Sequence, residues 1–302
     1  MIKTTKKNII LTVIVLIMLC ICGLFIANYY RNYKRIVYSK EALTLKSYSG
    51  TSTSERVIHN NESIPVLMYH SIPDKSSGNI MEVSKAQFRE EMEYLKKNGY
   101  NTLSADEFYD FIVKDKPVPK KSLLITFDDG YENQYANAYP ILKKYKFHAI
   151  MFIITNYLDK GTLYMQSAQL KTMSENGIDI ESHTANHDKL DQISYEAQLK
   201  TLKDSKNVIE GACNKAVRFI AYPYGYFNKD TVKASQDAGY IMAFTTSGKW
   251  ANTNKGVYAV NRIYIFPQYD LNNFKDRINN SNYTQIVHPI EMIKGAYKTF
   301  VK

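Results

Sequence analysis

At residues 122–130 the chain reads Ser122-Leu-Leu-Ile-Thr-Phe-Asp-Asp-Gly130, a short apolar run that ends in two carboxylates and a glycine. An apolar run of this length is typical of a buried strand, and the polar residues directly after it mark the strand's carboxyl end. Downstream, the segment Ile178–Ser182 is likewise followed by a polar residue, His183, and Arg218–Tyr222 is followed by the turn residues Pro223-Tyr-Gly225. Repetition of this unit indicates a parallel sheet.

Short apolar runs alternate with amphipathic segments from Ile64 onward, which is typical of repeated β-α units. The expected strands are Pro65–Tyr69, Ser122–Phe127, His148–Ile154, Ile178–Ser182, Arg218–Tyr222, Ile241–Thr245 and Val260–Ile265, with a weaker one near Asn101. Helices fill the gaps between them. The expected helices include one from Ser84 to Asn98, one opened by Ser104, and two over Tyr195–Glu210 and Lys229–Ala238, closed by Gly211 and Gly239.

Strands that alternate with helices can form an open doubly wound sheet or a closed barrel. Candidate site groups directly follow four of the expected strands: His70, Asp128 and Asp129, His183, and Pro223-Tyr224. In a barrel these strand ends meet at one face, where barrel active sites are built, whereas an open sheet would spread them along an edge. We therefore predict an α/β fold, an irregular (β/α) barrel of seven or eight strands, over residues 64–302.

The stretch from Ile9 to Ala27 is uncharged and almost wholly apolar, which is about the 20 residues that a membrane-spanning helix needs. The lysines before it would also suit a cleaved signal peptide, but residues 25–30 offer no small-residue cleavage site. We predict a cytoplasmic stub and transmembrane anchor over residues 1–30, a flexible linker over residues 31–63, and a folded domain outside the cytoplasm. A soluble secreted form is the alternative.

Composition excludes several classes of protein. With 302 residues and 45% hydrophobic content the chain can bury a large core, so it is globular. The formal charge of +10 comes without a long basic run or a nucleic-acid motif, so we expect a solvated surface, no nucleic-acid partner and no obligate protein partner. Only Cys213 lies outside the apolar N-terminal stretch, which excludes a disulfide framework and a cysteine-based zinc site.

The polar motifs supply a set of metal-ligand types. Asp128 and Asp129 stand together, and His183 and His187 form an H-x-x-x-H pair. Asp-Gly can be only a turn, and an i, i+4 histidine pair can be a core and a surface residue on one helix. Two imidazole nitrogens and one carboxylate oxygen, however, suit zinc and related divalent ions and leave room for water. The sequence therefore predicts a metal site.

Three segments together resemble the first three motifs of the NodB-homology polysaccharide deacetylases, the family-four carbohydrate esterases. They are Thr126-Phe-Asp-Asp-Gly130, His183-Thr-Ala-Asn-His187 and Arg218-x-x-x-x-Pro223-Tyr224. The resemblance extends in order and spacing from about Ile64 to Phe274. It implies an irregular β/α barrel, one divalent metal ion, zinc or else cobalt or manganese, and hydrolysis of N-acetyl groups from amino-sugar polymers, with some relatives acting on O-acetyl groups.

The resemblance also implies roles for particular residues. Those that would hold the metal are Asp129, His183 and His187. Asp128 would be the general base that takes a proton from the attacking water. Arg218 would orient this base through a charge-assisted bond, and Tyr224 would offer its backbone N–H to the developing oxyanion.

The segment Pro65-Val-Leu-Met-Tyr-His70 resembles the opening strand of the branch that includes the poly-N-acetylglucosamine deacetylases. In that branch the motif order is permuted, and His70 would protonate the leaving amine. His288, in an imperfect echo of the family's Leu-x-His motif, is the alternative acid. The family's tryptophan motif matches only partly, because Thr245 and Thr246 stand where an aspartate is expected before Trp250.

Four residues are candidates for binding sugar rings: Tyr131, Tyr222, Pro223 and Trp250. Core or rim packing explains the aromatic ones nearly as well. We expect a membrane-tethered, metal-dependent enzyme that removes N-acetyl groups from N-acetylglucosamine units of a cell-envelope polysaccharide, peptidoglycan or poly-N-acetylglucosamine, and releases acetate. The alternatives are an O-acetyl polysaccharide esterase of the same fold and a non-catalytic glycan-binding protein.

Overall fold

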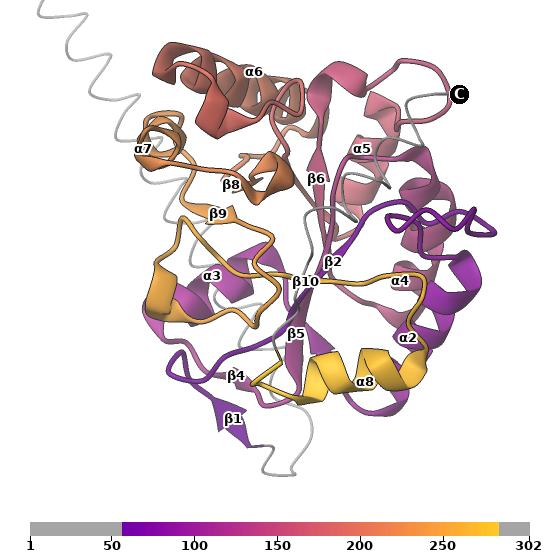
Figure 1. The fold of residues 1–302 in the computed structure, drawn as a ribbon. Helices are drawn as coiled ribbons and strands as arrows, with labels where there is room; N and C mark the ends of the chain where they lie inside the picture. Colours follow the sequence, from indigo (N-terminus) through magenta and orange to yellow (C-terminus); the bar gives the residue numbers. More distant parts are fainter. Residues whose placement is uncertain (1–55, 284–302) are drawn as a thin grey trace, which may run out of the picture. The chain divides into compact units, whose positions relative to one another are not determined.

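The structure of the protein, a computed structural model, describes residues 56–283 and contains one main sheet of eight strands (Figure 1). The strands are β2 (Val66–Tyr69), β3 (Asn101–Thr102), β5 (Ser122–Phe127), β6 (Ile150–Ile153), β7 (Asp179–Ser182), β8 (Phe219–Ala221), β9 (Met242–Phe244) and β10 (Ile263–Tyr264). Neighbours run parallel in the order β10-β2-β5-β6-β7-β8-β9, and β3 pairs with the start of β5. Every expected strand is confirmed.

The two outer strands of the sheet, β9 and β10, approach each other through the segment that leads into β10. The Val260 amide donates to the Ala243 carbonyl at 2.9 Å, and the Thr245 amide donates to the Val260 carbonyl at 2.8 Å. Phe244 and Val260 therefore form a parallel bridge. The result is a curled parallel sheet surrounded by helices, consistent with an irregular (β/α) barrel.

Helices lie around the central strands (Figure 1). They are α2 (Lys85–Lys97), α3 (Ala105–Lys114), α4 (Tyr139–Tyr145), α5 (Ser167–Glu175), α6 (Tyr195–Cys213), α7 (Lys229–Asp237) and α8 (Leu271–Asn279). The expected N-terminal caps are confirmed, since the Ser84 hydroxyl accepts from the Gln87 amide and Ser104 forms a reciprocal capping box with Glu107.

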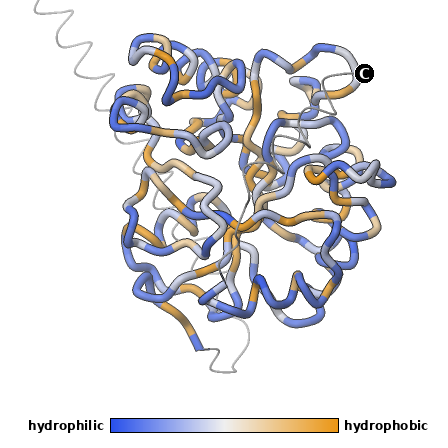
Figure 2. The backbone as a smooth tube through the Cα atoms, viewed as in Figure 1, coloured by the Kyte–Doolittle hydropathy of each residue, from blue (hydrophilic) through white to orange (hydrophobic). Residues whose placement is uncertain are grey.

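Alternation along the strands divides the buried residues between two faces of the sheet. Leu67 and Ile125 pack under the outer helices, whereas their neighbours Val66 and Leu124 belong to a second cluster, which also contains Phe108 of α3. Figure 2 accordingly shows mainly hydrophobic residues in the central strands and hydrophilic residues in much of the helices and loops. Helix α3 therefore packs against the inner face of the curled sheet.

One expected helix end is wrong. Helix α6 does not stop at Gly211 but continues to Cys213, and the left-handed residue that ends it is Asn214, with φ of 52°. Ile209 and Cys213 lie one turn apart and are both buried, so their packing outweighs the cost of about 1 kcal/mol for a glycine inside a helix.

Several predictions fall outside the described residues, namely the anchor over residues 1–30, most of the linker, and His288. No helix within residues 56–283 is long and apolar enough to cross a membrane. The expected boundary between linker and domain is wrong, because β1 (Val57–Ile58) pairs antiparallel with β4 (Val118–Pro119). The folded region therefore begins before Ile64.

Candidate active site

The polar motifs all follow the carboxyl ends of neighbouring parallel strands. His70 follows β2, Asp128 and Asp129 follow β5, His183 follows β7, and the turn Pro223–Gly225 follows β8. Since these strands lie side by side in the order β2-β5-β6-β7-β8, their ends lie on one face of the curl. The site residues come from segments far apart in the chain and are brought together by strand pairing.

Three side chains form a candidate metal site. Asp129 Oδ1 lies 3.5 Å from His183 Nε2 and 3.5 Å from His187 Nε2, and all three ligand atoms lie within 4.8 Å of one another. These separations are close to the roughly 3.4 Å expected between two ligands that each lie about 2.1 Å from a tetrahedral ion. Asp129 Oδ1 is buried and has no hydrogen-bond partner. A buried carboxylate oxygen without a donor fits a cation ligand.

Backbone contacts prepare His183 for this role. Its Nδ1 lies 2.8 Å from the Ala221 carbonyl oxygen. Because a carbonyl can only accept, Nδ1 must carry the proton, and the neutral ring then turns the Nε2 lone pair toward Asp129. Burial lowers the pKa of His183 and of His187 to about 4, so both rings are neutral at pH 7, as metal ligation requires.

The loops that carry these ligands have unusual backbone conformations. Four non-glycine residues of the site have positive φ, namely Asp129 at 74°, Thr184 at 66°, His187 at 62° and Tyr224 at 60°. The Thr184 hydroxyl accepts from the His187 amide at 2.9 Å and holds the H-x-x-x-H segment as a loop, not as a helical turn. Such strain is uncommon and gathers at functional sites.

Asp128 is held by a buried arginine. The Arg262 guanidinium donates to both carboxylate oxygens, Nη1 to Oδ1 at 2.6 Å and Nη2 to Oδ2 at 2.7 Å, and side-chain exposure is only 3% for Asp128 and 0% for Arg262. Burial by itself raises the pKa of Asp128, but the charge of the Arg262 guanidinium and its hydrogen bonds outweigh burial and lower the pKa to about 2. Asp128 is therefore ionised at neutral pH and fixed in orientation.

This contact corrects the role expected for Arg218. Arg218 precedes β8, at the amino end of the strand, and its guanidinium pairs with Asp106 of α3. Arg262 orients Asp128 instead, from the residue before β10. The sequence contains one signal that could have identified Arg262, because it is the single charged residue in the expected apolar strand Val260–Ile265.

A glutamine joins the ends of β2 and β5. Gln134 Nε2 donates to the His70 carbonyl at 2.9 Å and to the Asp128 carbonyl at 2.6 Å. Gln134 begins a π-helical turn over Gln134–Ala138, a distortion that often accompanies functional sites. Sequence reasoning missed Gln134, because a buried glutamine shows no pattern of its own. It fixes the separation between His70 and Asp128.

His70 lies on the same face and is 8% exposed. Its ring is parallel to that of Tyr264, with centroids 5.9 Å apart and an interplanar angle of 2°. The coulombic influence of His70 reaches both Asp128 and His187. The structure therefore brings His70 together with the candidate metal ligands, whereas His288 lies outside the described residues.

The turn Pro223–Gly225 lies beside the metal-site residues. The Tyr224 ring is 4.5 Å from that of His187, and its carbonyl accepts from the Thr246 hydroxyl at 3.2 Å. A Cβ at Gly225 would lie only 2.3 Å from Thr246 Oγ1, which explains why glycine is needed there. The turn is thus packed tightly against the segment that follows β9.

The four residues expected to bind sugar have different environments. Tyr131 stacks on Tyr164 at 5.3 Å, and burial together with the Asp129 charge raises its pKa, so Tyr131 lies at the candidate metal site. Pro223 is buried in the turn. Tyr222 is fully buried in the core against Phe227, which contradicts a role in a sugar groove.

Trp250 also lies away from the site. The next residue, Ala251, pairs with Ile64, which precedes β2, so Trp250 lies near the amino ends of the strands. Its indole donates to the Arg277 carbonyl of α8 at 2.7 Å. Trp250 therefore joins α8 to the sheet, and the expectation that it lines a sugar groove is wrong.

Comparison with known proteins identifies the family. The sequence profile described as polysaccharide deacetylase matches residues 115–243. The chain is 39% identical to YxkH of Bacillus subtilis, which is itself assigned to the polysaccharide deacetylases. This match spans 204 residues, which is 68% of this chain and 72% of that protein. It is 34% identical over 196 residues to the poly-beta-1,6-N-acetyl-D-glucosamine N-deacetylase of Staphylococcus aureus, 61% of this chain and 67% of that protein.

A solved structure gives the same result. The Streptococcus pyogenes deacetylase PplD in complex with acetate superposes with a TM-score of 0.68 at 32% identity, over 72% of this chain and 98% of that chain. The chain therefore belongs to the polysaccharide deacetylase family, with a NodB-type domain. The resemblance stated from the three motifs is confirmed.

Proposed function

We propose that this deacetylase is a metal-dependent hydrolase that removes N-acetyl groups from N-acetylglucosamine units of a cell-envelope polysaccharide and releases acetate. The observation that carries the proposal is the partnerless Asp129 Oδ1 between two imidazole nitrogens, beside an ionised Asp128. We favour poly-β-1,6-N-acetylglucosamine as substrate, since the Staphylococcus aureus relative is named for it, with peptidoglycan as the alternative.

The ion would be held by Asp129, His183 and His187. A divalent metal bound there would supply Lewis-acid chemistry, polarising the acetyl carbonyl and making the attacking water more acidic. A donor set of two nitrogens and one oxygen favours zinc, and cobalt or manganese could replace it.

The chain's own residues move the protons. Each Asp128 oxygen keeps a lone pair after bonding Arg262, so Asp128 can accept a proton from the attacking water. The backbone N–H of Tyr224 donates to the carbonyl oxygen as negative charge develops on it. His70 gives a proton to the sugar nitrogen when the C–N bond breaks, so that the nitrogen leaves as an amine.

We also propose that the apolar stretch Ile9–Ala27 anchors the chain in the cell membrane, with the deacetylase domain outside the cytoplasm and residues 31–55 as a tether. An envelope polysaccharide would then be within reach of the site. Membrane fractionation and protease treatment of intact cells test this arrangement. A mature protein that lacks residues 1–30 would contradict it.

Acetate release tests the proposed reaction. The purified protein is stripped of metal, restored with zinc, cobalt or manganese, and assayed on β-1,6-linked N-acetylglucosamine oligomers and on peptidoglycan. We expect release only with metal, a loss of about 10³-fold in Asp128→Asn and a loss of at least about 100-fold in His70→Ala. His148→Ala serves as the matched control, because His148 is exposed and lies at the amino end of β6.

Two results would contradict the proposal. Equal release before and after metal removal would exclude the metal from the reaction. Release of O-acetyl groups alone, with His70→Ala close to full activity, would indicate an esterase, because an alcohol needs less protonation than an amine to leave.

A further inference from the structure

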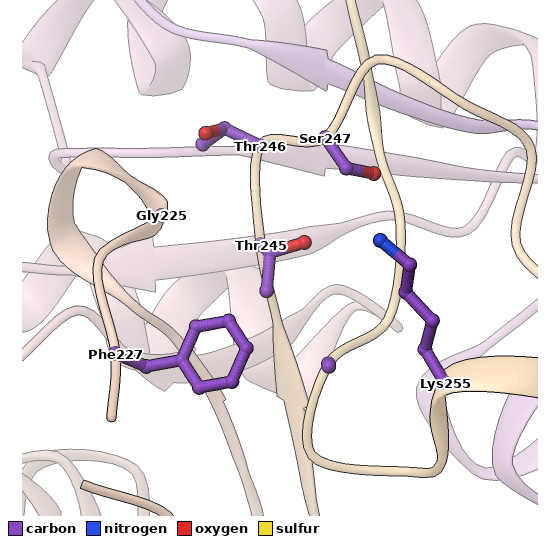
Figure 3. Close-up of a pocket in the computed structure, with 7 residues that line it drawn as sticks. Gly225, Phe227, Thr245, Thr246, Ser247 and Lys255 are labelled. Carbon is purple, nitrogen blue, oxygen red and sulfur yellow. The ribbon is translucent and has the colours of Figure 1, made fainter. Parts of the chain in front are cut away.

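A small cavity lies next to the turn Pro223–Gly225 and is separate from the metal-site residues. Its volume is about 160 Å³, and its lining residues are Gly225, Phe227, Thr245, Thr246, Ser247, Lys255 and Ala259. Figure 3 shows the Lys255 ammonium, the Thr245 hydroxyl and the Phe227 ring directed toward the same space. On this measure a single water needs about 10–15 Å³, so the cavity can admit a group considerably larger than one water.

The cavity and the candidate active site share one wall. Gly225 lines the cavity, and the preceding residue, Tyr224, contacts the His187 ring. Thr246 lines the cavity as well and donates to the Tyr224 carbonyl at 3.2 Å. A polymer with one unit at the metal site could therefore place a neighbouring unit in this cavity.

The hydroxyls of the cavity can act mainly as acceptors. Thr245 donates to the Val260 carbonyl at 3.1 Å, and Ser247 donates to Asn261 Oδ1 at 2.6 Å. Since each hydroxyl has only one proton, its remaining capacity is to accept. The cavity therefore offers acceptors, one cationic donor and an aromatic wall, a combination that suits a sugar with hydroxyl donors better than an isolated anion.

Lys255 gives the cavity a positive charge. Within residues 56–283 it forms no ion pair with a carboxylate, so its charge is not neutralised locally. We propose that the cavity binds a sugar unit next to the one being deacetylated, and that Lys255 makes it prefer an N-acetylated unit over a deacetylated one. This inference rests on the proposed deacetylase function.

The physical reason is repulsion between two ammonium groups. A glucosamine produced at the active site carries a positive charge, and Lys255 repels it once the polymer moves by one unit. Two unit charges about 4 Å apart in water interact by about 1 kcal/mol, which corresponds to about fivefold in affinity. Deacetylation would then be spaced along the polymer and not continuous.

Binding and product pattern test the inference in the full-length protein. The binding arm measures the affinity of fully N-acetylated and fully deacetylated β-1,6-linked glucosamine pentamers by calorimetry with chelator present. The variants are Lys255→Met, Lys255→Arg, which keeps the charge, and Lys249→Met, which removes a charge from an exposed lysine that does not line the cavity.

We expect the wild-type preference for the acetylated pentamer to fall about fivefold in Lys255→Met and to persist in Lys255→Arg and Lys249→Met. Neighbouring glucosamines in the product should become more frequent in Lys255→Met alone. An unchanged preference in Lys255→Met, or no binding of either pentamer by the wild type, would overturn the inference. If the wild type releases no acetate but shows the Lys255-dependent preference, the proposed reaction fails while the binding site stands.

Discussion

Arg262 and Asp128 form a charge pair with almost no exposure to solvent. Taking both ions out of water costs several kcal/mol each, and only good geometry and further hydrogen bonds offset that cost. Arg262 has both, since it donates to two oxygens of Asp128, to Thr126 Oγ1 at 3.1 Å and to the Thr245 carbonyl at 2.9 Å. The position and the ionisation of Asp128 therefore depend on one arginine.

We expect Arg262→Lys to lower kcat/KM by about 100-fold and the free energy of unfolding by about 3 kcal/mol. The reason is that an ammonium cannot donate to both carboxylate oxygens with the fixed geometry of a guanidinium. Arg218→Lys is the matched control. Because the ion pair of Arg218 is half-exposed, we expect this variant to lower the free energy of unfolding by less than about 1 kcal/mol. Steady-state kinetics and denaturant unfolding measure both. A larger loss of kcat/KM in Arg218→Lys than in Arg262→Lys would mean that Arg218 orients Asp128.

The candidate metal site can be tested by metal binding alone, without an assay of the reaction. We expect Asp129→Asn to weaken zinc affinity by at least about 100-fold, because a neutral amide replaces the single anionic ligand of the set. Asp159→Asn is the control, since Asp159 is exposed and also has a positive φ. Competition with a chromophoric chelator measures the affinity. Equal zinc binding by both variants would exclude Asp129 as a ligand.

At the scale of elements, the site residues belong to the loops that follow the strands, and the strands determine where these loops lie. Three hydrogen-bonded contacts fix the loop after β7: the Thr184 amide donates to the Ser182 hydroxyl, the Ala185 amide to Thr201 of α6, and the His187 amide to Thr184. Helix α6 thus supports the loop that presents both histidines. Positive φ angles persist there because these contacts determine the backbone.

The turn after β8 gives a prediction at this scale. Gly225→Ala places a Cβ within 2.9 Å of the Thr246 amide nitrogen at a φ of 73°. Gly99→Ala has a similar φ of 70° and no atom within 4 Å of the new Cβ. We expect the positive φ to lower the free energy of unfolding by about 1 kcal/mol in both variants. Only Gly225→Ala should lose further stability and show at least tenfold lower kcat, because only its Cβ meets Thr246.

Thermal unfolding and acetate release compare the two alanine variants directly. The difference between them isolates the contact between the turn and Thr246 from the general effect of a side chain at positive φ. Equal stability and equal kcat in the two would mean that the turn can shift without disturbing the site.

At the scale of the whole molecule, one buried carboxyl joins a helix to the sheet. Glu91 of α2 accepts from the Tyr69 hydroxyl of β2 at 2.8 Å and from Gln87 at 3.0 Å. Burial raises the pKa of Glu91 from 4.5 to about 7, despite hydrogen bonds from Gln87 and Tyr69 that lower it. The folded protein therefore holds this proton more tightly than the unfolded chain does.

The raised pKa of Glu91 makes the stability of the protein depend on pH. Between about pH 4.5 and pH 7 the folded state binds more protons at Glu91 than the unfolded state, so this residue's contribution to the free energy of unfolding falls as pH rises, by about 3 kcal/mol in total. We expect Glu91→Gln to remove most of that slope, and Glu93→Gln, at a half-exposed position of the same helix, to keep it. Urea unfolding from pH 5 to pH 8 measures the slopes. Identical slopes in both variants would contradict the assignment.

Much of the architecture could be predicted from short stretches of sequence. Apolar runs such as Ser122–Phe127 form strands because their own residues favour burial on both faces, and serines such as Ser104 begin helices by local hydrogen bonds. The end of α6 was missed for the opposite reason, since packing of Cys213 outweighed the local signal of Gly211. Tyr222 was misplaced because alternation in a strand turned its ring to the outer face.

The sequence by itself determined which residues meet at the candidate active site, because the motifs at Asp128–Asp129, His183 and His187 each lie within a few residues at the end of a strand. Only the tertiary structure decided how they are supported. Arg262 lies 134 residues after Asp128, and the two meet because the sheet curls until the segment before β10 faces β5. Contacts of that kind depend on strand order and curl, which no local pattern of residues encodes.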